Sequence, residues 1–335
     1  MRIAIAGAGL MGRWHAYYAT RCGAAIAGVS DPNLPETELK RRFRGAAIFQ
    51  RTEPLLDRVK PQILHVCTPA ATHEAIIESA LEAGVHLLVE KPLLATAKAT
   101  QRLVAKAAER GLLLVPVHQY VFQEGAMRTA ASLKSIGKPL HMDAVICSAG
   151  GAHLRGAQLD ELIADMLPHP LSLLDSFFPG MLGAMEWTTL HPANGEWRAS
   201  GVGRGMSVSI LVSLNGRPTE SSARLTGTNG TARLDLFHGF AVLEPGGISR
   251  SRKITHPFSL ASRTFCSASG NLARRFLTRE PAYPGLRRLI GLFYEAVRRH
   301  SDAPLSADHI IGVARARERL CSEEWFGGRQ RTSQG

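Results

Sequence analysis

Asp165 and His169 have residue types and a spacing that suit proton transfer. They are four residues apart, so on a helix the carboxylate and the imidazole would lie one turn apart on the same face. A carboxylate in that position can orient the ring and favour its protonated form. A lone histidine could equally be a packed core residue. The pairing favours a general acid–base pair, in which His169 exchanges the proton with a substrate.

Two more polar groups each follow a short apolar run that reads as a buried strand. Thr68-Pro69 with His73 comes after residues 63–67, and Glu90-Lys91-Pro92 comes after residues 85–89. The carboxyl ends of parallel strands meet at one edge of a sheet and form its ligand crevice. We therefore expect these two groups to converge there.

A glycine-rich turn, Gly7-Ala8-Gly9-Leu10-Met11-Gly12, lies between an apolar strand at residues 2–6 and a helix. Gly7 permits the tight turn, Gly9 lets the backbone approach a pyrophosphate, and Gly12 allows close packing of helix on strand. The helix N-terminus then offers free N–H groups to the phosphates. This pattern predicts a dinucleotide site in which Leu10 and Met11 also contact the cofactor.

Asp31 bears on the identity of that cofactor. It ends a second apolar strand, nineteen residues after Gly12, where a carboxylate can accept hydrogen bonds from a ribose diol. The same charge repels the 2′-phosphate of NADP, so we predict NAD. Arg41 and Arg42 keep NADP open as the less favoured alternative, because either could reach an adenosine phosphate.

The elements that position these residues change type near residue 120. Residues 1–120 alternate apolar strands with helices, which predicts a doubly wound parallel sheet of the Rossmann type. Residues 121–335 contain period-two stretches at 184–190, 206–214, 221–226 and 231–236, with Asn-Gly turns at 215–216 and 229–230. We expect a second, α+β domain with a large, open, mainly antiparallel sheet and a helix over about 161–178.

Composition narrows the class of protein. The chain has 335 residues, of which 45% are hydrophobic and 20% charged, and no apolar run approaches the length of a membrane span. The first strand begins at residue 2, which leaves no room for a signal peptide. The five cysteines are scattered and lack zinc-site spacing. We expect a cytoplasmic protein with reduced thiols and no metal site.

The net charge of +12 is concentrated in one segment. Residues 250–300 hold ten arginines and one lysine against two glutamates. No nucleic-acid-binding motif accompanies this charge, so we expect no nucleic-acid partner. Arginines near the helical stripe at 286–297 read as a solvated face. Arg263 and Arg274 lie in a stretch that reads as less regular, and we expect them to grip an anionic substrate.

The motifs together resemble the Gfo/Idh/MocA family, the glucose–fructose oxidoreductase and inositol dehydrogenase group. The resemblance rests on the glycine turn, on Ser30-Asp31-Pro32, on Cys67-Thr68-Pro69 with His73, on residues 83–92 ending in Glu-Lys-Pro, on Asp165 with His169, and on residues 225–231. It spans nearly the whole chain. It implies a Rossmann domain followed by an α/β domain whose open sheet often mediates oligomer contacts.

The resemblance also assigns roles. It implies that Lys91 contacts nicotinamide ribose and substrate, and that Asp165 and His169 form the substrate's proton-transfer pair. Thr68, Pro69, His73, Glu90 and His118 are expected near the cofactor. The segment Gln119-Tyr120-Val121-Phe122 stands where the family often reads Asn-Arg-Arg-Phe, so the loss of an arginine there is expected to change substrate contacts, with Gln119 among the residues that contact the substrate. A homodimer or homotetramer through the C-terminal sheet is expected.

We therefore predict an NAD(P)-dependent oxidoreductase that transfers hydride between nicotinamide and a secondary alcohol or ketone of a sugar-like substrate. If Arg263 and Arg274 contact this substrate, we expect it to be anionic or nucleotide-linked. Two alternatives stay open at this point. One is an enzyme that recycles its NAD, as in redox-assisted glycosidases or lyases. The other is a non-catalytic NAD-sensing regulator on the same fold.

Overall fold

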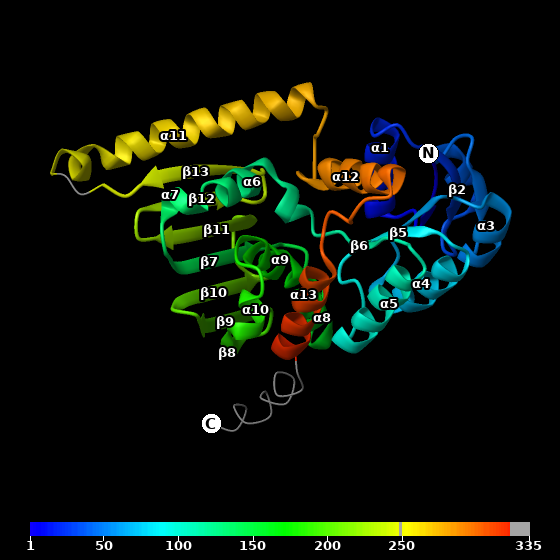
Figure 1. Cartoon of the computed structure of the whole chain (residues 1–335), viewed down its shortest axis with the longest axis horizontal. Helices are drawn as coiled ribbons and strands as arrows, with labels where there is room; N and C mark the ends of the chain where they lie inside the picture. Colours follow the sequence, from blue (N-terminus) through cyan, green and yellow to red (C-terminus); the bar gives the residue numbers. More distant parts are fainter. Residues whose placement is uncertain (248–249, 322–335) are drawn as a thin grey trace. The chain divides into compact units, whose positions relative to one another are not determined.

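The computed structural model describes residues 1–247 and 250–321, without the side chains of residues 250–253. These residues form two compact units (Figure 1). The first unit comprises Met1–Val117 and Leu286–Arg315, and the second comprises the described residues of His118–Gly285 together with residues 316–321. The expected boundary near residue 120 therefore describes one crossing, and the chain returns to the first unit at Leu286.

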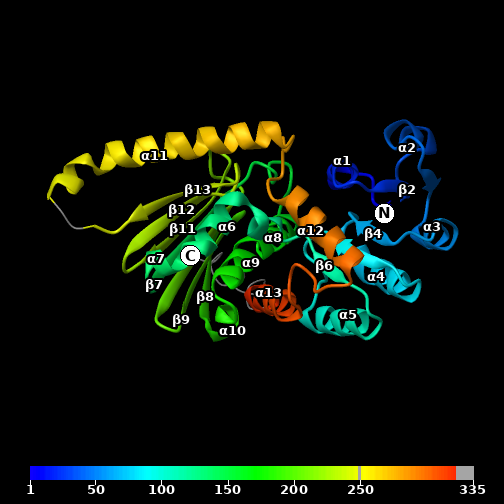
Figure 2. The same cartoon turned by 45° about the horizontal axis from the view of Figure 1, so that its top comes forward.

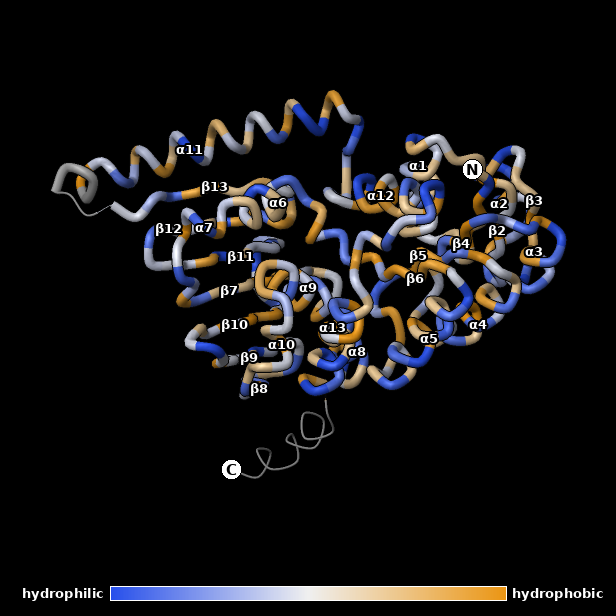
Figure 3. Tube along the Cα trace, in the orientation of Figure 1, coloured by the Kyte–Doolittle hydropathy of each residue, from blue (hydrophilic) through white to orange (hydrophobic). Residues whose placement is uncertain are grey.

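The first unit is built on a six-stranded parallel sheet of order β3-β2-β1-β4-β5-β6, the order of a doubly wound dinucleotide-binding fold. Its central strands are buried, apart from the half-buried His86 at the start of β5, and appear as hydrophobic segments in Figure 3. This confirms the Rossmann prediction. The strands are β1 (Arg2–Ala6), β2 (Ala25–Ser30), β3 (Ala47–Phe49), β4 (Ile63–Val66), β5 (His86–Val89) and β6 (Leu114–Pro116).

Helices follow these strands as the sequence predicted. Thr96 caps one of them, because its Oγ1 accepts a hydrogen bond from the Ala99 N–H at 3.2 Å, and Gly111 follows its end with a φ of 66°. The helices are α1 (Leu10–Arg21), α2 (Glu36–Arg42), α3 (Thr52–Val59), the 3₁₀ turn η1 (Ala70–Thr72), α4 (His73–Glu82), α5 (Ala97–Glu109) and α12 (Leu286–Arg299).

The helix α12 explains why the chain returns to the first unit. Its apolar side, including Leu289 and Phe293, is fully buried, and α12 packs against α1. The Tyr294 hydroxyl lies 2.9 Å from Nε2 of His65 in β4. Arg288 and Arg298 stay exposed, which agrees with the solvated face predicted for this helix.

The second unit is built on a seven-stranded sheet of order β13-β12-β11-β7-β10-β9-β8. Every strand pair is antiparallel except β7 with β10, which confirms a mainly antiparallel sheet. The strands are β7 (Pro139–Cys147), β8 (Glu186–Ala193), β9 (Glu196–Gly203), β10 (Met206–Ser213), β11 (Glu220–Gly227), β12 (Gly230–Asp235) and β13 (Phe240–Pro245).

The two Asn-Gly turns have different outcomes. The turn at Asn229-Gly230 joins β11 to β12, which pair as a hairpin. The turn at Asn215-Gly216 joins β10 to β11, but these strands lie on opposite sides of β7 and do not pair with each other. Local sequence fixes a turn, whereas the partner of each strand depends on the whole sheet.

Helices of the second unit are shorter, with one exception. The predicted helix over 161–178 divides at Leu167, because Pro168 and Pro170 lack the N–H groups that a continuous helix needs. The elements are η2 (Gln119–Phe122), α6 (Glu124–Ala131), α7 (Leu133–Ile136), α8 (Ala157–Met166), α9 (Pro168–Phe177), α10 (Met181–Ala184), the long α11 (Arg250–Leu277) and, with its first part in the other unit, α13 (Ala307–Leu320).

The helix α11 was not expected from the sequence, which reads as less regular around Arg263 and Arg274. Pro257, several serines and a glycine weaken the helical signal there. Tertiary contacts supply the missing stability, because α11 packs along β13, as Figures 1 and 2 show. Among the described helices, none combines the length and the apolarity that a membrane crossing needs.

Candidate active site

The glycine turn of the first unit leaves open space where a dinucleotide backbone would pass. A Cβ atom on Gly7 would lie 2.6 Å from the carbonyl oxygen of Cys67, and one on Gly12 would lie 2.0 Å from the carbonyl oxygen of Gly7. These two glycines are therefore required by packing. A Cβ on Gly9 would meet nothing within 4 Å. The space above Gly9 fits a phosphate group.

The N-terminus of α1 adds hydrogen-bond donors to that space. Gly9 occupies the N-cap position, and no side chain of the described residues caps it. Leu10, the first residue of the helix, is 54% exposed. The first backbone N–H groups of a helix carry partial positive charge and have no partner within the helix. Residues Gly7 to Gly12 thus fit the pyrophosphate of NAD(P).

Asp31 is fixed beside this turn by backbone hydrogen bonds. Its Oδ2 accepts from the Ala8 N–H at 2.8 Å, and its Oδ1 accepts from the N–H groups of Asn33 and Leu34 at 2.9 and 3.0 Å. A carboxylate can accept about four hydrogen bonds, so capacity remains for a ribose hydroxyl. The carboxylate is held in the position that the sequence predicted for it, at the end of β2.

Of the two arginines behind the NADP alternative, Arg42 lies at the turn. Its Nη1 is 3.4 Å from the carbonyl oxygen of Ala8, and its guanidinium also pairs with Glu38. Arg41 is largely exposed and lies 3.9 Å from the same glutamate. Arg42 is therefore the cation that could meet a 2′-phosphate.

The segments that follow β4 and β5 are joined through His73. Its ring is fully buried; Nδ1 lies 3.1 Å from the carbonyl oxygens of both Pro92 and Leu93, and Nε2 lies 2.9 Å from that of Thr68. The structure thus brings the Thr68–Pro69 loop beside the segment after Lys91. In this arrangement His73 organises the loop, and its expected contact with the cofactor stays a prediction.

Lys91 is the second residue after β5, and its peptide bond to Pro92 is cis. The preceding residue, Glu90, is buried, and its Oε2 accepts a hydrogen bond from the Lys91 N–H at 3.2 Å. Burial alone would raise the pKa of Glu90. A hydrogen bond from His15 and the positive charges of His15 and Lys91 outweigh that effect, so this pKa lies below its usual value.

A buried hydrogen-bonded chain leads away from Glu90, and the sequence did not reveal it. Nε2 of His15 lies 3.1 Å from Oε1 of Glu90, and the two Nδ1 atoms of His15 and His65 lie 2.9 Å apart. Tyr294 closes the far end through His65. Burial, with the neighbouring His15, lowers the pKa of His65 well below its usual value. The only sequence signal was a pair of histidines at apolar positions of a helix and a strand.

In the second unit, His169 stacks on Tyr120. The ring centroids are 4.2 Å apart and the planes differ by 14°. The Tyr120 hydroxyl lies 3.0 Å from Oγ of Ser221, and burial raises the pKa of this phenol. His169 is 9% exposed, at the start of α9. The stack fixes the plane of the imidazole, a role for Tyr120 that sequence spacing did not indicate.

Asp165 lies at the end of α8, before the break at Leu167. Leu167 keeps helical dihedral angles of −57° and −35°, so Asp165 and His169 remain about one turn apart along the chain. Cys321 is electrostatically coupled to this region. Burial raises the pKa of its thiol to about 12, with Arg317 lowering it and Asp165 raising it.

His118 and Gln119 are buried at the start of the second unit, 3% and 7% exposed. Among the described residues, Oε1 of Gln119 has no hydrogen-bond partner. A buried amide oxygen without a partner is costly unless a ligand or water satisfies it. Gln119 is therefore well suited to bind a substrate hydroxyl, and its contact with substrate stays a prediction.

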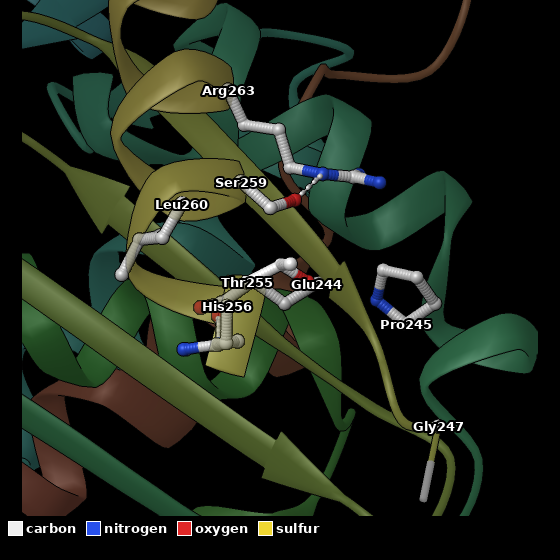
Figure 4. A pocket seen from close by; sticks show the side chains of 8 residues that line it. All are labelled: Glu244, Pro245, Gly247, Thr255, His256, Ser259, Leu260 and Arg263. Carbon is white, nitrogen blue, oxygen red and sulfur yellow. Dashed lines mark hydrogen bonds and ion pairs between the residues drawn. The ribbon is translucent and has the colours of Figure 1, made fainter. Parts of the chain in front are cut away.

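Arg263 and Arg274 bind their own chain. Arg263 donates to the carbonyl oxygen of Leu243 at 3.1 Å and lines a hollow of about 240 Å³ with Glu244 and His256 (Figure 4). Arg274 donates to Oδ1 of Asn271 at 3.2 Å and lies 3.7 Å from Glu280. The Glu244 carboxylate opposes an anion at this hollow. A substrate contact for either arginine stays a prediction.

Comparisons with known proteins point to one family. Residues 1–118 match the family described as GFO_IDH_MocA, "Oxidoreductase family, NAD-binding Rossmann fold". These residues therefore carry the NAD-binding Rossmann fold of that family. Among curated proteins, it is 28% identical over 298 residues to UDP-N-acetylglucosamine 3-dehydrogenase of Acidithiobacillus ferrooxidans, covering 86% of this chain and 81% of that protein.

Two further proteins extend the comparison, one by sequence and one by fold. The chain is 26% identical over 267 residues to dTDP-3,4-didehydro-2,6-dideoxy-alpha-D-glucose 3-reductase of Streptomyces violaceoruber, covering 76% of this chain and 72% of that protein. Its fold matches the WlbA dehydrogenase from Bordetella pertussis, solved with NADH and UDP-GlcNAcA, with a TM-score of 0.74, 16% identity and coverage of 96% and 95%.

With this fold and these relatives, the chain is an enzyme of the NAD(P)-dependent dehydrogenase and reductase type that acts on CH–OH groups. Its relatives include dehydrogenases and reductases of sugars and nucleotide-linked sugars. They do not favour a redox-assisted glycosidase or lyase, or a regulator without catalysis.

Proposed function

We propose that this enzyme uses NAD to oxidise a secondary alcohol on the sugar ring of a nucleotide-linked substrate, or runs the reverse reduction. The observation that carries the proposal is the glycine turn with Asp31 fixed beside it. Asp31 has one remaining acceptor position for a ribose hydroxyl, and its charge disfavours a 2′-phosphate.

In the oxidative direction, three side chains of this chain act on the alcohol. Lys91 donates a hydrogen bond to the reacting oxygen and polarises it. His169 takes the hydroxyl proton as the carbonyl forms, and Asp165 stabilises the resulting imidazolium. Bound NAD supplies the acceptor for the hydride that leaves the same carbon. Tyr120 holds the His169 ring in one plane through its stack.

Two relatives suggest the class of substrate and the position of attack. One is named a UDP-N-acetylglucosamine 3-dehydrogenase and the other a dTDP-sugar 3-reductase. Both names specify a nucleotide-linked hexose and ring position 3. We propose the same class and position here, with Gln119 Oε1 accepting a hydrogen bond from a ring substituent.

The direct test is a substrate panel with the purified full chain. NAD reduction is followed by absorbance with UDP-N-acetylglucosamine, UDP-glucose, a dTDP-hexose, free N-acetylglucosamine and myo-inositol. We expect turnover with one of the nucleotide-linked sugars at least tenfold above turnover with the free sugars. The best substrate, deuterated at ring position 3, should transfer deuterium to the nicotinamide.

Two results would contradict the proposal. Best turnover with a free sugar or myo-inositol would exclude a nucleotide-linked substrate. Retention of deuterium in the product would exclude ring position 3 as the site of oxidation. A His169→Gln variant serves as the matched control for background reduction, because glutamine keeps polarity without a titrating ring. Hydrolysis of a glycosidic bond with no net NAD reduction would instead support the recycling alternative.

A further inference from the structure

The long helix α11 attaches to the second sheet by one side only. Ser267 Oγ donates to the carbonyl oxygen of Ala241 at 2.9 Å, and Asn271 Nδ2 donates to that of His238 at 3.0 Å. These residues and Leu260 lie on the side that faces β13. The opposite side of α11 therefore has no cover within this unit among the described residues.

That opposite side carries a stripe of large apolar side chains. We call this set the α11 stripe: Ile254, Phe258, Phe265, Leu272 and Phe276. The side chains of the stripe are 69–81% exposed. Successive helical residues are 100° apart around the axis, so these five side chains fall within about 40° of one another.

The spacing of the α11 stripe is symmetrical about its centre. Successive members are four, seven, seven and four residues apart, with Phe265 in the middle. A two-fold axis makes residue i of one copy contact residue j of the other, and j contact i. A second α11 running antiparallel would place Phe265 against Phe265, Phe258 against Leu272, and Ile254 against Phe276.

Seven-residue intervals are typical of helices that pack along their length at a small crossing angle. The residues three positions after Phe258 and Phe265 are the alanines Ala261 and Ala268. Alternation of large and small side chains lets two facing helices interdigitate. The stripe would span about 33 Å, from its first to its last member.

The charges around the α11 stripe indicate whether its partner is a second copy of this chain or an anionic surface. The described arginines of α11 bind their own chain: Arg263 to Leu243, Arg274 to Asn271 and Glu280, and Arg275 to the carbonyl oxygens of His238, Glu280 and Pro281. Residues beside the stripe, such as Ser262 and Ser269, are small and neutral. The stripe thus offers an apolar contact and presents no side-chain charge that would bind an anionic partner.

The area is sufficient for a specific contact. Three phenylalanines with an isoleucine and a leucine, mostly exposed, amount to about 600 Å² of apolar surface per copy. Monomeric proteins rarely expose a continuous apolar patch of that size, and a standard interface buries about 800 Å² per partner. We propose that two copies of this chain associate through antiparallel pairing of the α11 stripe.

The alternative interface is the open face of the sheet, where oligomer contacts were expected from the family resemblance. Strand pairing places Asp143, Ser209, Ser200 and Thr188 in one row across that face. Leu190 is 60% exposed on the same face, so polar and apolar rows alternate across the sheet, whereas the α11 stripe is continuously apolar. Val202, 62% exposed on the same face, is the site for a discriminating substitution.

Sedimentation velocity on the full chain, over a hundredfold range of concentration, tests the proposal. The wild type should form dimers that Phe258→Asp and Phe265→Asp convert to monomers, with unchanged circular dichroism. Leu277→Asp is the matched control, because Leu277 is 79% exposed on the same helix but lies about 100° around it from the stripe. Leu277→Asp should leave the dimer intact.

Crosslinking places the axis. In a Cys266→Ser background, Phe265→Cys should form a disulfide-linked dimer on mild oxidation, whereas Leu277→Cys should not. A monomeric wild type, or loss of the dimer in Val202→Asp but not in the stripe variants, would overturn the proposal. So would a monomer that binds vesicles containing phosphatidylserine through the same stripe, since the occupant would then be a lipid surface.

Discussion

The Nδ1 atoms of His15 and His65 lie 2.9 Å apart, at the centre of a buried chain that joins Glu90 to Tyr294. These contacts run from the Tyr294 hydroxyl through His65 and His15 to Glu90, whose Oε1 accepts from Nε2–H of His15. Glu90 precedes Lys91, so this chain anchors the strand end on which Lys91 stands.

This relationship makes stability depend on pH. The pKa of His65 is far below its usual 6.5 in the folded protein, so the unfolded chain takes up a proton that the folded chain refuses as pH falls below 6.5. The free energy of unfolding should fall in that range, by up to about 1.4 kcal/mol per pH unit. Denaturant titrations at a series of pH values measure the slope.

His65→Asn should flatten that slope whatever its effect on absolute stability. His153→Asn, at an exposed histidine, should leave the slope unchanged. If wild type and His65→Asn lose the same unfolding free energy between pH 7 and ~5, groups other than His65 cause the loss. Glu90 does not interfere, because its lowered pKa places its own loss of stability below its usual 4.5.

The stack of Tyr120 on His169 should contribute to turnover. Aromatic pairs are worth about 0.5–1.5 kcal/mol beyond burial, which corresponds to roughly a 2- to 10-fold change in rate. Tyr120→Leu should lower kcat by that factor and broaden the pH profile, while Tyr120→Phe should stay within about twofold of wild type. If Phe and Leu variants lose activity equally, the hydroxyl bond to Ser221 matters and the stack does not.

Cofactor preference should depend on Asp31. We expect NAD(H) to bind at least several-fold more tightly than NADP(H), and Asp31→Asn to narrow that ratio, since asparagine keeps one acceptor oxygen without the charge. Fluorescence titration of both cofactors measures it. Arg42→Ala is the complementary variant and should weaken NADP(H) more than NAD(H). Tighter NADP(H) binding by the wild type would overturn the preference.

Loss of the proton-transfer groups should affect chemistry more than cofactor binding. His169→Ala and Lys91→Ala should each lower turnover about a hundredfold or more. Circular dichroism and, for His169→Ala, cofactor affinity should be unchanged. Near-native turnover by His169→Ala on the substrate that the panel identifies would show that another group carries the proton.

Arg274 in α11 allows a structural role to be distinguished from a role in substrate binding, by comparing the free energy of unfolding with KM. Arg274 holds Asn271 and approaches Glu280, so Arg274→Ala should cost about 1–2 kcal/mol of unfolding free energy with little change in KM. Arg288→Ala, at an exposed arginine, is the control. If the wild-type KM increases with salt concentration, and the KM of Arg274→Ala is higher than that of wild type, this arginine instead contacts an anionic substrate.

The sequence by itself determined the nucleotide half of this protein. The order of strand, glycine turn, helix and Asp31 is local, because each part depends on backbone sterics within about thirty residues. The parallel sheet, the cap at Thr96 and the hairpin at Asn229-Gly230 follow from equally local signals. For the same reason, the general class of enzyme could be predicted from motifs alone.

Tertiary structure decided the contacts between residues distant in sequence. His15, His65, Glu90 and Tyr294 meet because α1, β4, β5 and α12 share one unit, and no spacing along the chain encodes that meeting. Tyr120 lies on His169 for the same kind of reason. The helix α11 exists where local propensity is weak because β13 supports one side of it, which leaves the other side, with its symmetrical apolar stripe, to face outward.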